Sequence, residues 1–510
     1  MSGWSQGYIT AIPYTHGFHR ELAPVAMRMA LLAAGVSHDI DPVQFRVCEL
    51  GCGRGLDCNI LAATQPLASF TGVDFNPAHV ADARALAAAA GLANVEFVES
   101  DFSAFEARNL QPFDIVLLHG VWSWVSVENR DVILRFLERH LRPGGIAYVS
   151  YNALPGWSQL QPLGRLVYEL VVADQGDMEG RIGRALRTAG ALRNTDAHYF
   201  RANAQAGPLL DDLARRSDAY IAHEYCNRDW APFFHADVAR AFESASLRFA
   251  ASADLRDALS ELDLTPEQAG LMRAMPGVTQ REMLRDYLVQ RRLRRDIYVK
   301  GESGTATSPS WDEVRLALVV PRTDVPRAIE GASSTVALDD ADSMTALDAL
   351  AEGPRSVAQL REVQRLAALD ASAVRALVLH LLGAGVVEPC LDGEGEAVST
   401  DGVHRLNRAI LARAHVSGET GFLASPVTGN GIAVSRHDQL FLLAQLEGHA
   451  DPVRFAAQTL SRQGVQVARE GRALPRESDV LDELRLRHAR FESAVLSLLT
   501  RLKVVPGVNS

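Results

Sequence analysis

A glycine-rich turn directly after a short apolar segment is the feature that most restricts the fold of this chain. Residues 45–50 (FRVCEL) predict a buried strand, and the run Glu49-Leu-Gly51-Cys-Gly53-Arg-Gly55 follows at its end. Glycines in such a turn let the backbone bend tightly and approach a ligand where a Cβ atom would collide. The turn therefore predicts an α/β fold with a ligand site at the end of the first strand.

Strand and helix patterns alternate regularly on both sides of this turn. Alternation at this spacing predicts a parallel, doubly wound, Rossmann-like sheet. We also expect two later strands, at 246–251 and 297–300, to complete the sheet, with a helical insertion at 156–236. The expected core strands are 45–50, 69–74, 95–98, 115–119 and 146–152, and the expected helices are 56–64, 77–90 and 129–140.

The chain is too long for one ordinary core, because 510 residues exceed the roughly 250–300 at which cores stop growing. A Gly/Ser/Thr-rich linker is expected at 301–310. The C-terminal half is expected to be mostly helical, with a winged-helix-like element inside its first domain. The predicted domains are 1–35 capping the site, 36–155 as the core, 156–300 as a middle domain, 311–395 as the winged-helix-like domain and 400–510 as a helical domain.

Three further features follow the glycine turn in order along the chain. Asp74 ends the second strand, where a carboxylate can accept hydrogen bonds from both hydroxyls of a ribose. Asp101 and Phe102 follow the third strand, where they offer an acceptor and an apolar surface to an adenine ring. A Pro-Gly-Gly turn at 143–145 leads into the fifth strand. The G-x-G-x-x-G spacing of nicotinamide-binding folds fails, because residue 56 is Leu.

This order of features resembles the core of class I S-adenosylmethionine-dependent methyltransferases. The resemblance implies S-adenosylmethionine as the cofactor, and the acidic Glu49 suits its cationic methionine end better than a diphosphate. The expected cofactor-binding residues are Glu49, Gly51, Gly53, Gly55, Asp74, Phe75, Asp101, Phe102, His119 and Trp122.

The fourth strand ends in the run HGVWSWV at 119–125. The two tryptophans can flank the methyl group or a substrate chain, or they can pack in the core, and packing is favoured for Trp124. Two roles are open for His119: it can support the site through hydrogen bonds, or it can act as a general base. The Asp/Asn-Pro-Pro-aromatic clamp of nucleobase methyltransferases is absent at this place.

Several further motifs resemble bacterial class I methyltransferases that carry a methyltransferase regulatory domain. Rickettsial protein-lysine methyltransferases share this architecture, so the resemblance implies a protein substrate and N-methylation of lysine. Its motifs are Tyr14 in a Pro-Tyr-Thr segment, SYNALPGW at 150–157, HEYCN at 223–227, WAPFF at 230–234 and RRDIYVKG at 294–301. The candidate catalytic residues are Tyr14, His119, Tyr151 and Trp157, and Tyr8 is a further aromatic candidate at the mouth of the site.

Two other functions stay open. The chain can methylate a small molecule beneath the helical middle domain, or it can act as a cofactor-sensing regulatory protein. A net charge of −11 argues against nucleic acid as a partner. Residues 371–382 of the winged-helix-like part contain only Arg375 and His380 as cations, which also argues against DNA.

The remaining expectations concern metals, membranes and assembly. His223 and Glu224 lack the H-E-x-x-H spacing, so no metal is expected. No apolar run approaches the roughly 20 residues of a membrane span, and no secretory signal is visible, so we expect a cytoplasmic protein without a membrane partner. A homodimer is one oligomeric state compatible with the chain.

Overall fold

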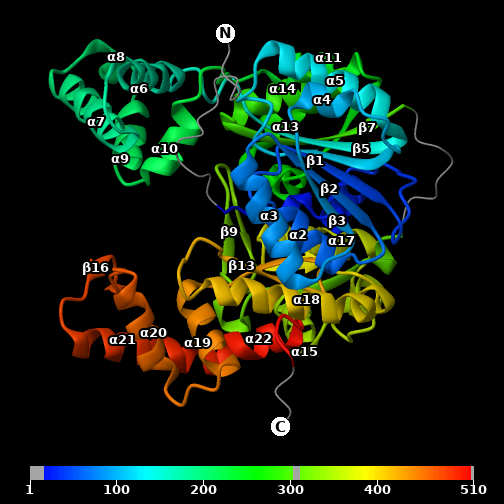
Figure 1. Cartoon of the computed structure of the whole chain (residues 1–510). Helices are drawn as coiled ribbons and strands as arrows, with labels where there is room; N and C mark the ends of the chain where they lie inside the picture. Colours follow the sequence, from blue (N-terminus) through cyan, green and yellow to red (C-terminus); the bar gives the residue numbers. More distant parts are fainter. Residues whose placement is uncertain (1–15, 302–309, 507–510) are drawn as a thin grey trace.

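A seven-stranded sheet is the central element of the computed structural model, which describes residues 16–301 and 310–506 (Figure 1). The strand order is β3-β2-β1-β4-β5-β7-β6. Strands β1 to β5 are parallel, and β7 lies antiparallel between β5 and β6. This order confirms the predicted Rossmann-like sheet. The strands are β1 (Arg46–Leu50), β2 (Ser69–Asp74), β3 (Val95–Glu99), β4 (Phe113–Leu118), β5 (Leu141–Asn152), β6 (Leu247–Ser252) and β7 (Leu293–Lys300).

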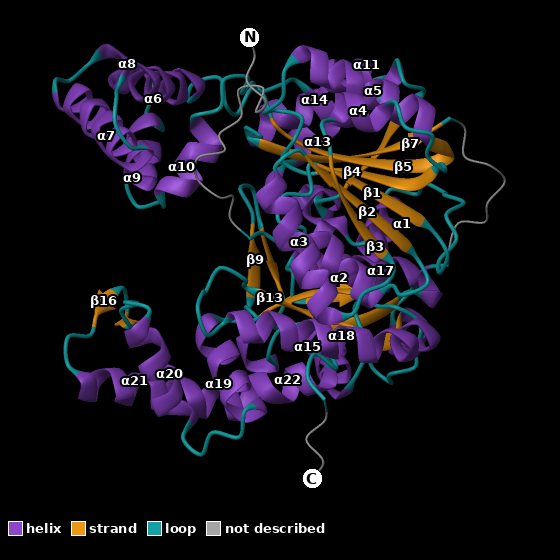
Figure 2. Cartoon of the chain, in the orientation of Figure 1, coloured by secondary structure: helices purple, strands orange, loops and turns teal. Residues whose placement is uncertain are grey.

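Both faces of this sheet are covered, as Figure 2 shows. Side chains alternate between two buried clusters: Val47 faces one and Cys48 the other, and Ile115 and Val116 repeat the alternation. The near-continuous apolar character of the strands follows from this double coverage. The core helices are the 3₁₀ turn η1 (Arg20–Leu22), α1 (Pro24–Ala33), α2 (Leu56–Thr64), α3 (Pro77–Ala90), α4 (Phe102–Glu106), α5 (Val127–His140) and α11 (His235–Glu243).

Helix α3 shows how local sequence sets the element boundaries. The Asn76 side chain accepts from the backbone N–H of Ala78, Pro77 occupies the first turn, and Gly91 ends the helix at φ +62°. These are the residue types that favour a helix start and stop. The start of α3 at Pro77 is thereby fixed three residues after Asp74, at the carboxyl edge of the sheet.

A helical lobe projects from the core between β5 and α11, at the upper left of Figure 1. It lies within the insertion predicted at 156–236, and the segment behind it returns to complete the sheet. The lobe contains α6 (Gln161–Ala173), α7 (Met178–Asn194), α8 (His198–Ala202), α9 (Ala206–Leu213) and α10 (Asp218–Tyr225). The returning segment adds η2 (Leu255–Ala258), α12 (Ser260–Asp263), α13 (Pro266–Arg273) and α14 (Val278–Val289).

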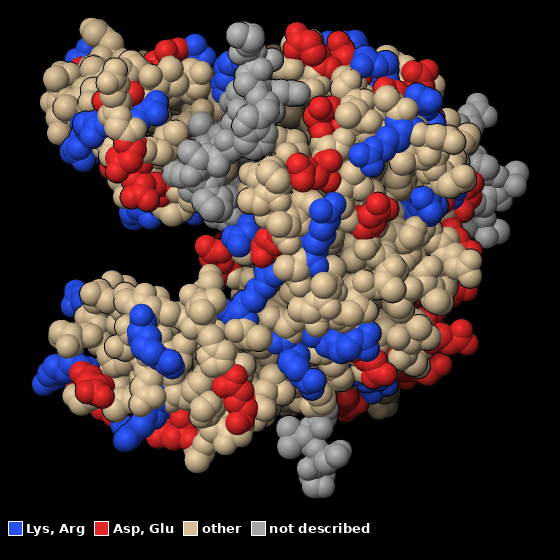
Figure 3. All heavy atoms as spheres, viewed as in Figure 1, with Lys and Arg blue, Asp and Glu red and all other residues tan. Residues whose placement is uncertain are grey.

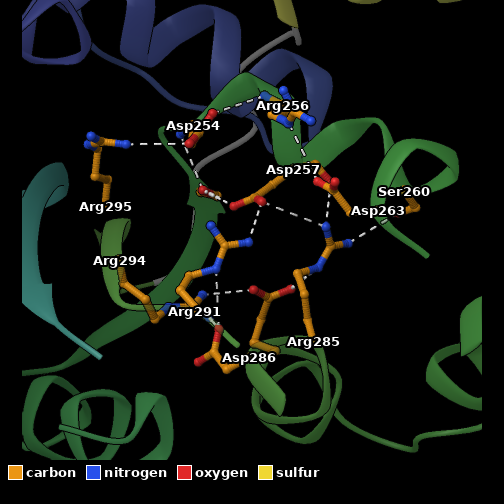
Figure 4. Close-up of polar contacts among 12 residues, drawn as sticks. Asp254, Arg256, Asp257, Ser260, Asp263, Arg285, Asp286, Arg291, Arg294 and Arg295 are labelled. Carbon is orange, nitrogen blue, oxygen red and sulfur yellow. Dashed lines mark hydrogen bonds and ion pairs between the residues drawn. The ribbon is translucent and has the colours of Figure 1, made fainter. Parts of the chain in front are cut away.

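A network of buried and half-buried charges joins this returning segment to β7, and Figure 4 shows most of it. Arg294, only 2% exposed, contacts Glu282 and Asp286 at 2.7 Å and Asp296 at 3.0 Å. Arg291 adds contacts to Asp286 and to Asp257. We call this set the ion cluster; it comprises Asp257, Glu282, Arg285, Asp286, Arg291, Arg294 and Asp296.

Residues from 310 onward begin with a small antiparallel sheet and three helices. The sheet order is β11-β8-β12, and its core also includes Met29 and Leu32 of α1. The predicted linker lies outside the described residues except at its two ends. The elements are η3 (Trp311–Glu313), β8 (Arg315–Leu318), η4 (Arg322–Asp324), β9 (Ala328–Glu330), β10 (Thr335–Ala337), α15 (Ala341–Glu352), β11 (Arg355–Ser356), α16 (Val357–Arg361), η5 (Leu366–Ala368), α17 (Ala371–Gly383) and β12 (Val387–Pro389).

The last part of the chain packs directly on the core. Val403, Leu406 and Ile410 of α18 share one apolar cluster with Ile60 of α2 and Leu86 of α3. This region is mostly helical, as expected, but it also contains two hairpins that the sequence analysis missed. The elements are α18 (Gly393–Arg413), β13 (Phe422–Ser425), β14 (Asn430–Ala433), α19 (Arg436–Leu446), α20 (Pro452–Arg462), β15 (Ala468–Arg469), β16 (Arg472–Ala473), α21 (Glu477–Arg490), the π-helical η6 (Phe491–Val495) and α22 (Leu496–Arg501).

The two helical lobes leave a deep open notch on the face shown in Figure 3. One side of the notch is the lobe of α6 to α10, and the other is the C-terminal lobe around α20 and α21. Among the described residues, none of the helices combines the length and the apolar character that a bilayer crossing requires.

Candidate active site

A cavity lies at the carboxyl ends of β1 to β4, where the sequence analysis expects the ligand. The N-terminal segment, the glycine turn, the ends of the strands and the loop after α10 all contribute to its wall. The described lining residues are His16, Gly17, His19, Glu49, Gly51, Cys52, Gly53, Arg54, Gly55, Leu56, Asp57, Asp74, Phe75, His79, Ser100, Asp101, Phe102, His119, Gly120, Val121, Trp124, Val125, Ser126, Asn129 and Asp229.

The glycine turn has the backbone that its sequence predicts. Gly51 has φ +79° and Gly55 has φ +68°, in the left-handed region where other residues are strained. A Cβ atom on Gly55 would lie 2.5 Å from the Cβ of Ala83 and 2.6 Å from the Phe97 ring. Neither Gly51 nor Gly55 therefore tolerates a side chain. The turn packs tightly between the end of β1 and the start of α2.

Asp74 is held by the backbone on both sides. Its Oδ2 accepts from the N–H of Gly53 at 2.9 Å, and its Oδ1 accepts from the N–H of Asn76 at 2.8 Å. At 7% exposure the carboxylate is buried and yet lines the cavity. It is thus fixed at the end of β2, beside the glycine turn, in the position expected for a ribose-binding acid.

Asp101 and Phe102 line the cavity at the start of α4. The Oδ1 of Asp101 accepts from the N–H of Ala104 at 2.8 Å, so this carboxylate caps the helix. Capping fixes the side chain at the end of β3. The two residues therefore lie where the sequence analysis expects an adenine ring.

Glu49 is a buried acid without a full counter-charge. It is 3% exposed and accepts a hydrogen bond from the Cys58 thiol at 3.0 Å. Burial, followed by the nearby charge of Asp57, raises the pKa of Glu49 to about 8. A carboxyl group with such a pKa is neutral at pH 7, and a cationic ligand beside it would favour its ionisation.

His19 and Asp57 form a pair that the sequence analysis missed. The Oδ1 of Asp57 accepts from the backbone N–H of His19 at 2.7 Å, and Oδ2 lies 3.1 Å from the ring Nδ1. Burial opposes the charge of His19, but Asp57, together with Glu21 and Glu49, more than offsets burial and raises the pKa of the imidazole. Asp57 could have been recognised from the sequence, because it is an acidic residue in the first turn of a buried helix. His19 could not, because it lies in a segment without a periodic pattern. We call His19, Glu49, Asp57 and Asp74 the cavity cluster.

His119 lies at the end of β4 and stacks on His19, with ring centroids 3.6 Å apart. Its Nδ1 lies 3.1 Å from the Tyr148 hydroxyl, which in turn donates to Glu21 at 3.5 Å. Burial and the charge of His19 hold the pKa of His119 well below its usual value. The ring is therefore neutral at pH 7 and carries a proton on only one of its two nitrogens.

The structure exchanges the roles expected for the two tryptophans. Trp122 was expected at the cofactor, but it is 3% exposed and packs against Phe233 and Phe242. Trp124, for which packing was favoured, lines the cavity. The loop after β4 turns between them, and no sequence pattern indicates which ring points inward.

The other catalytic candidates lie away from the cavity wall or outside the described residues. Tyr151 is fully buried, and its hydroxyl donates to Asp296 at 2.7 Å, next to His235. Trp157 donates from Nε1 to the Arg292 carbonyl at 2.9 Å. The structure thus places these two beside β7. Tyr8 and Tyr14 lie outside the described residues.

The C-terminal part of the chain reaches the rim of the cavity, which the sequence analysis did not anticipate. Arg54 of the glycine turn contacts Asp82 and Glu419 at 2.9 Å each. His16 lies between the same two carboxylates, at 2.9 and 3.0 Å. Arg413 also contacts Asp82, at 3.2 Å. Four segments distant in sequence therefore meet at one edge of the cofactor cavity.

The charge of the cavity fits a cationic cofactor. Its described lining includes the carboxylates of Asp57, Asp74, Asp101 and Asp229, the carboxyl group of Glu49, and one guanidinium, that of Arg54. The excess of negative charge suits a sulfonium and an ammonium group. Sheet order, glycine turn and acidic cavity together define a class I S-adenosylmethionine-dependent methyltransferase.

Comparisons with known proteins agree with this class. A family model described as "Methyltransferase domain" matches residues 43–189, and one described as "Predicted methyltransferase regulatory domain" matches residues 217–300. The Synechocystis protein sll1526 is 32% identical over 504 residues, which cover 98% of this chain and 99% of that protein. A trans-aconitate 2-methyltransferase from Acidovorax is 29% identical over 189 residues, covering 37% of this chain and 63% of its own length.

A solved structure covers nearly the whole chain. PKMT2 from Rickettsia typhi, determined in complex with AdoHcy, has a TM-score of 0.68 at 17% identity and covers 96% of this chain and 99% of its own. The common fold therefore extends through the C-terminal half. The chain belongs to the family of class I methyltransferases that carry a methyltransferase regulatory domain.

Proposed function

We propose that this methyltransferase transfers methyl groups to lysine side chains of a bacterial protein. The observation that carries the proposal is the acidic character of the cavity, whose described lining has five acidic side chains and one guanidinium that is itself paired with Asp82 and Glu419. Such a cavity attracts a cationic side chain and disfavours an acidic acceptor. The resemblance of the sequence motifs to rickettsial protein-lysine methyltransferases implies the same substrate class, and PKMT2 shares the fold.

The chemistry requires the acceptor amine to lose its proton before it attacks. When bound, S-adenosylmethionine supplies an electrophilic methyl group on its sulfonium. The protein chiefly has to align the amine in line with that methyl group and exclude water.

His119 is suited to orient the amine. The Nδ1 of His119 lies 3.1 Å from the Tyr148 hydroxyl and 3.4 Å from Ser150 Oγ, and we propose the tautomer in which Nδ1 carries the proton and donates to Tyr148. In this tautomer Nε2 of His119 carries a lone pair and can accept a hydrogen bond from an acceptor amine. Because the pKa of His119 lies well below its usual value, this role is orientation and not proton storage. Trp124 offers an aromatic face that stabilises a methylated ammonium.

A small acidic acceptor is the second candidate, suggested by the similarity to trans-aconitate 2-methyltransferase. An acid with several carboxylates would need cationic partners in the cavity. Arg54 and His16, the two candidate partners at the rim, each already contact two carboxylates. The charge balance therefore favours the lysine acceptor.

The experiment is methylation of a host-cell lysate with methyl-labelled cofactor, followed by separation of protein from small molecules. We expect label in protein, and N-methyl-lysine after acid hydrolysis. The Asp74→Ala variant serves as the matched control without cofactor binding. Label confined to the small-molecule fraction, or protein label without methyl-lysine, would contradict the proposal.

A further inference from the structure

The amino-acid end of the cofactor carries a carboxylate as well as an ammonium, so an acidic cavity needs one available positive group for it. The described lining contains few candidates. They are His16, His19, Arg54, His79 and His119.

Two of these cations are committed to other residues. Arg54 and His16 both contact Asp82 and Glu419, at 2.9 to 3.0 Å. Both side chains are therefore already engaged by carboxylates at the rim. A ligand carboxylate there would have to compete with charges already in contact.

Two other candidates are unsuited for different reasons. The ring of His119 is neutral, because burial and the neighbouring His19 disfavour its protonation. The Nδ1 of His79 lies 3.5 Å from Asp74, at the end of the cavity expected to hold the ribose. Neither offers a cation to the amino-acid end.

His19 has the required geometry. Asp57 fixes it through the backbone N–H at 2.7 Å and through Nδ1 at 3.1 Å. Its side chain is 31% exposed, so the ring is reachable while it is held. With Nδ1 engaged by Asp57, Nε2 is the remaining donor. Stacking on His119 at 3.6 Å fixes the plane of the ring.

Glu49 completes the arrangement. Glu49 and His19 both line the cavity beside the glycine turn, and the charge of each bears on the protonation of the other. One can carry a positive and the other a negative charge. A zwitterionic amino acid is recognised by such a complementary pair, and charge-assisted hydrogen bonds are the strong ones.

We infer that His19, oriented by Asp57, binds the carboxylate of the cofactor's amino-acid end, while Glu49 faces its ammonium. His19 is thus a cofactor-binding residue supplied by the N-terminal segment. The inference concerns cofactor recognition alone and does not depend on the identity of the methyl acceptor.

The test is titration calorimetry of the full chain with two ligands that differ only in the carboxylate. S-adenosylhomocysteine carries it, and the decarboxylated analogue S-adenosyl-3-thiopropylamine lacks it. We expect the wild type to prefer S-adenosylhomocysteine about tenfold or more, the usual effect of one hydrogen bond between charged groups. His19→Gln should lose this preference by weakening S-adenosylhomocysteine alone, and His19→Lys should restore part of it.

The decarboxylated ligand is an internal control for folding, since its affinity should change less than about twofold in His19→Gln. His16→Gln is the matched control from the same segment, and it should keep the wild-type ratio of the two affinities. The inference is overturned if His19→Gln keeps the wild-type ratio of the two affinities, whether both affinities stay unchanged or both fall by the same factor. No methyl acceptor is present in this titration. Neither result therefore bears on the proposed lysine substrate, which the labelling of the host-cell lysate tests separately.

Discussion

Two groups of buried charges lie in this molecule, and they differ in how completely they are paired. In the ion cluster, Arg294 contacts three carboxylates within 3.0 Å, and Asp296 also accepts from Tyr151. Burial alone would raise the pKa of Asp296, but Arg294, His235 and Tyr151 lower it to about 2. In the cavity cluster, burial and the charge of Asp57 raise the pKa of Glu49 to about 8. The charge of His19 acts in the opposite direction but offsets only part of this rise.

The difference separates a structural cluster from a binding cluster. Each charge in the ion cluster contacts at least one opposite charge, so that removing one leaves another buried with fewer partners. The cavity cluster keeps a carboxyl group under-compensated, as is common where a cationic ligand is to be bound. Mutations should therefore affect stability in the first cluster and cofactor affinity in the second.

The largest expected effect is on the ion cluster. Asp296→Asn should lower the free energy of unfolding by about 3–5 kcal/mol, because Arg294 then remains buried with one carboxylate fewer. Urea unfolding of the full chain measures this. Asp254→Asn, with a side chain 34% exposed at the edge of the same network, should cost less than about 1 kcal/mol. Equal costs for the two variants would show that the cluster is not a cooperative structural unit.

Asp74→Ala should weaken S-adenosylhomocysteine by about 100-fold while leaving the fold intact. The variant loses two hydrogen bonds from ribose hydroxyls to a charged acceptor. Calorimetry measures the affinity, and circular dichroism checks the fold. Retained affinity would remove Asp74 from the cofactor site.

Glu49→Gln should weaken the cofactor about tenfold, because one charged contact to the ammonium is lost. In the wild type, cofactor binding at pH 7 should release up to about one proton, because burial keeps the Glu49 carboxyl group protonated before binding and the ammonium of the cofactor favours its ionisation. Calorimetry in two buffers of different ionisation enthalpy counts that proton. The Glu49→Gln variant should release no proton from residue 49 on cofactor binding. A proton count equal to that of the wild type would contradict the assignment of Glu49 to the ammonium of the cofactor.

The same pKa predicts the pH dependence of stability without cofactor. Glu49 is raised from 4.5 to about 8, so across that interval the folded chain holds a proton that the unfolded chain has lost. The contribution of Glu49 to the free energy of unfolding is then full below about pH 4.5 and is lost as the pH rises to about 8. Glu49→Gln should flatten this fall in thermal unfolding measured from pH 5 to 9.

The smallest expected effect tests whether the C-terminal part supports the cavity cluster. Glu419→Gln removes one partner of Arg54 and His16 at the rim, and it should weaken the cofactor about two- to fivefold, since the pair is partly exposed. The effect should shrink at high salt. Glu447→Gln, at an exposed ion pair with His415 in the same part of the chain, is the matched control and should leave affinity unchanged.

Elements with strong local patterns were predictable from the sequence. The order of strands and helices from residue 45 to 152 and the closing strands β6 and β7 follow from apolar runs and turn residues. The hairpin of β13 and β14 was missed, although Gly429 at φ +63° marks its turn, because short strands between helices carry little pattern. The choice between Trp122 and Trp124 depends on the path of one loop, which no periodicity encodes.

The sequence by itself determined the sheet, the glycine turn and the acids at the strand ends, because each follows from residues that are neighbours along the chain. Only the tertiary structure decided that His19 pairs with Asp57, that Glu419 reaches Arg54, and that Tyr151 faces Asp296. The last two pairs join residues 365 and 145 positions apart. Such contacts arise from the packing of whole elements, so the site is completed by segments whose local sequence gives no sign of it.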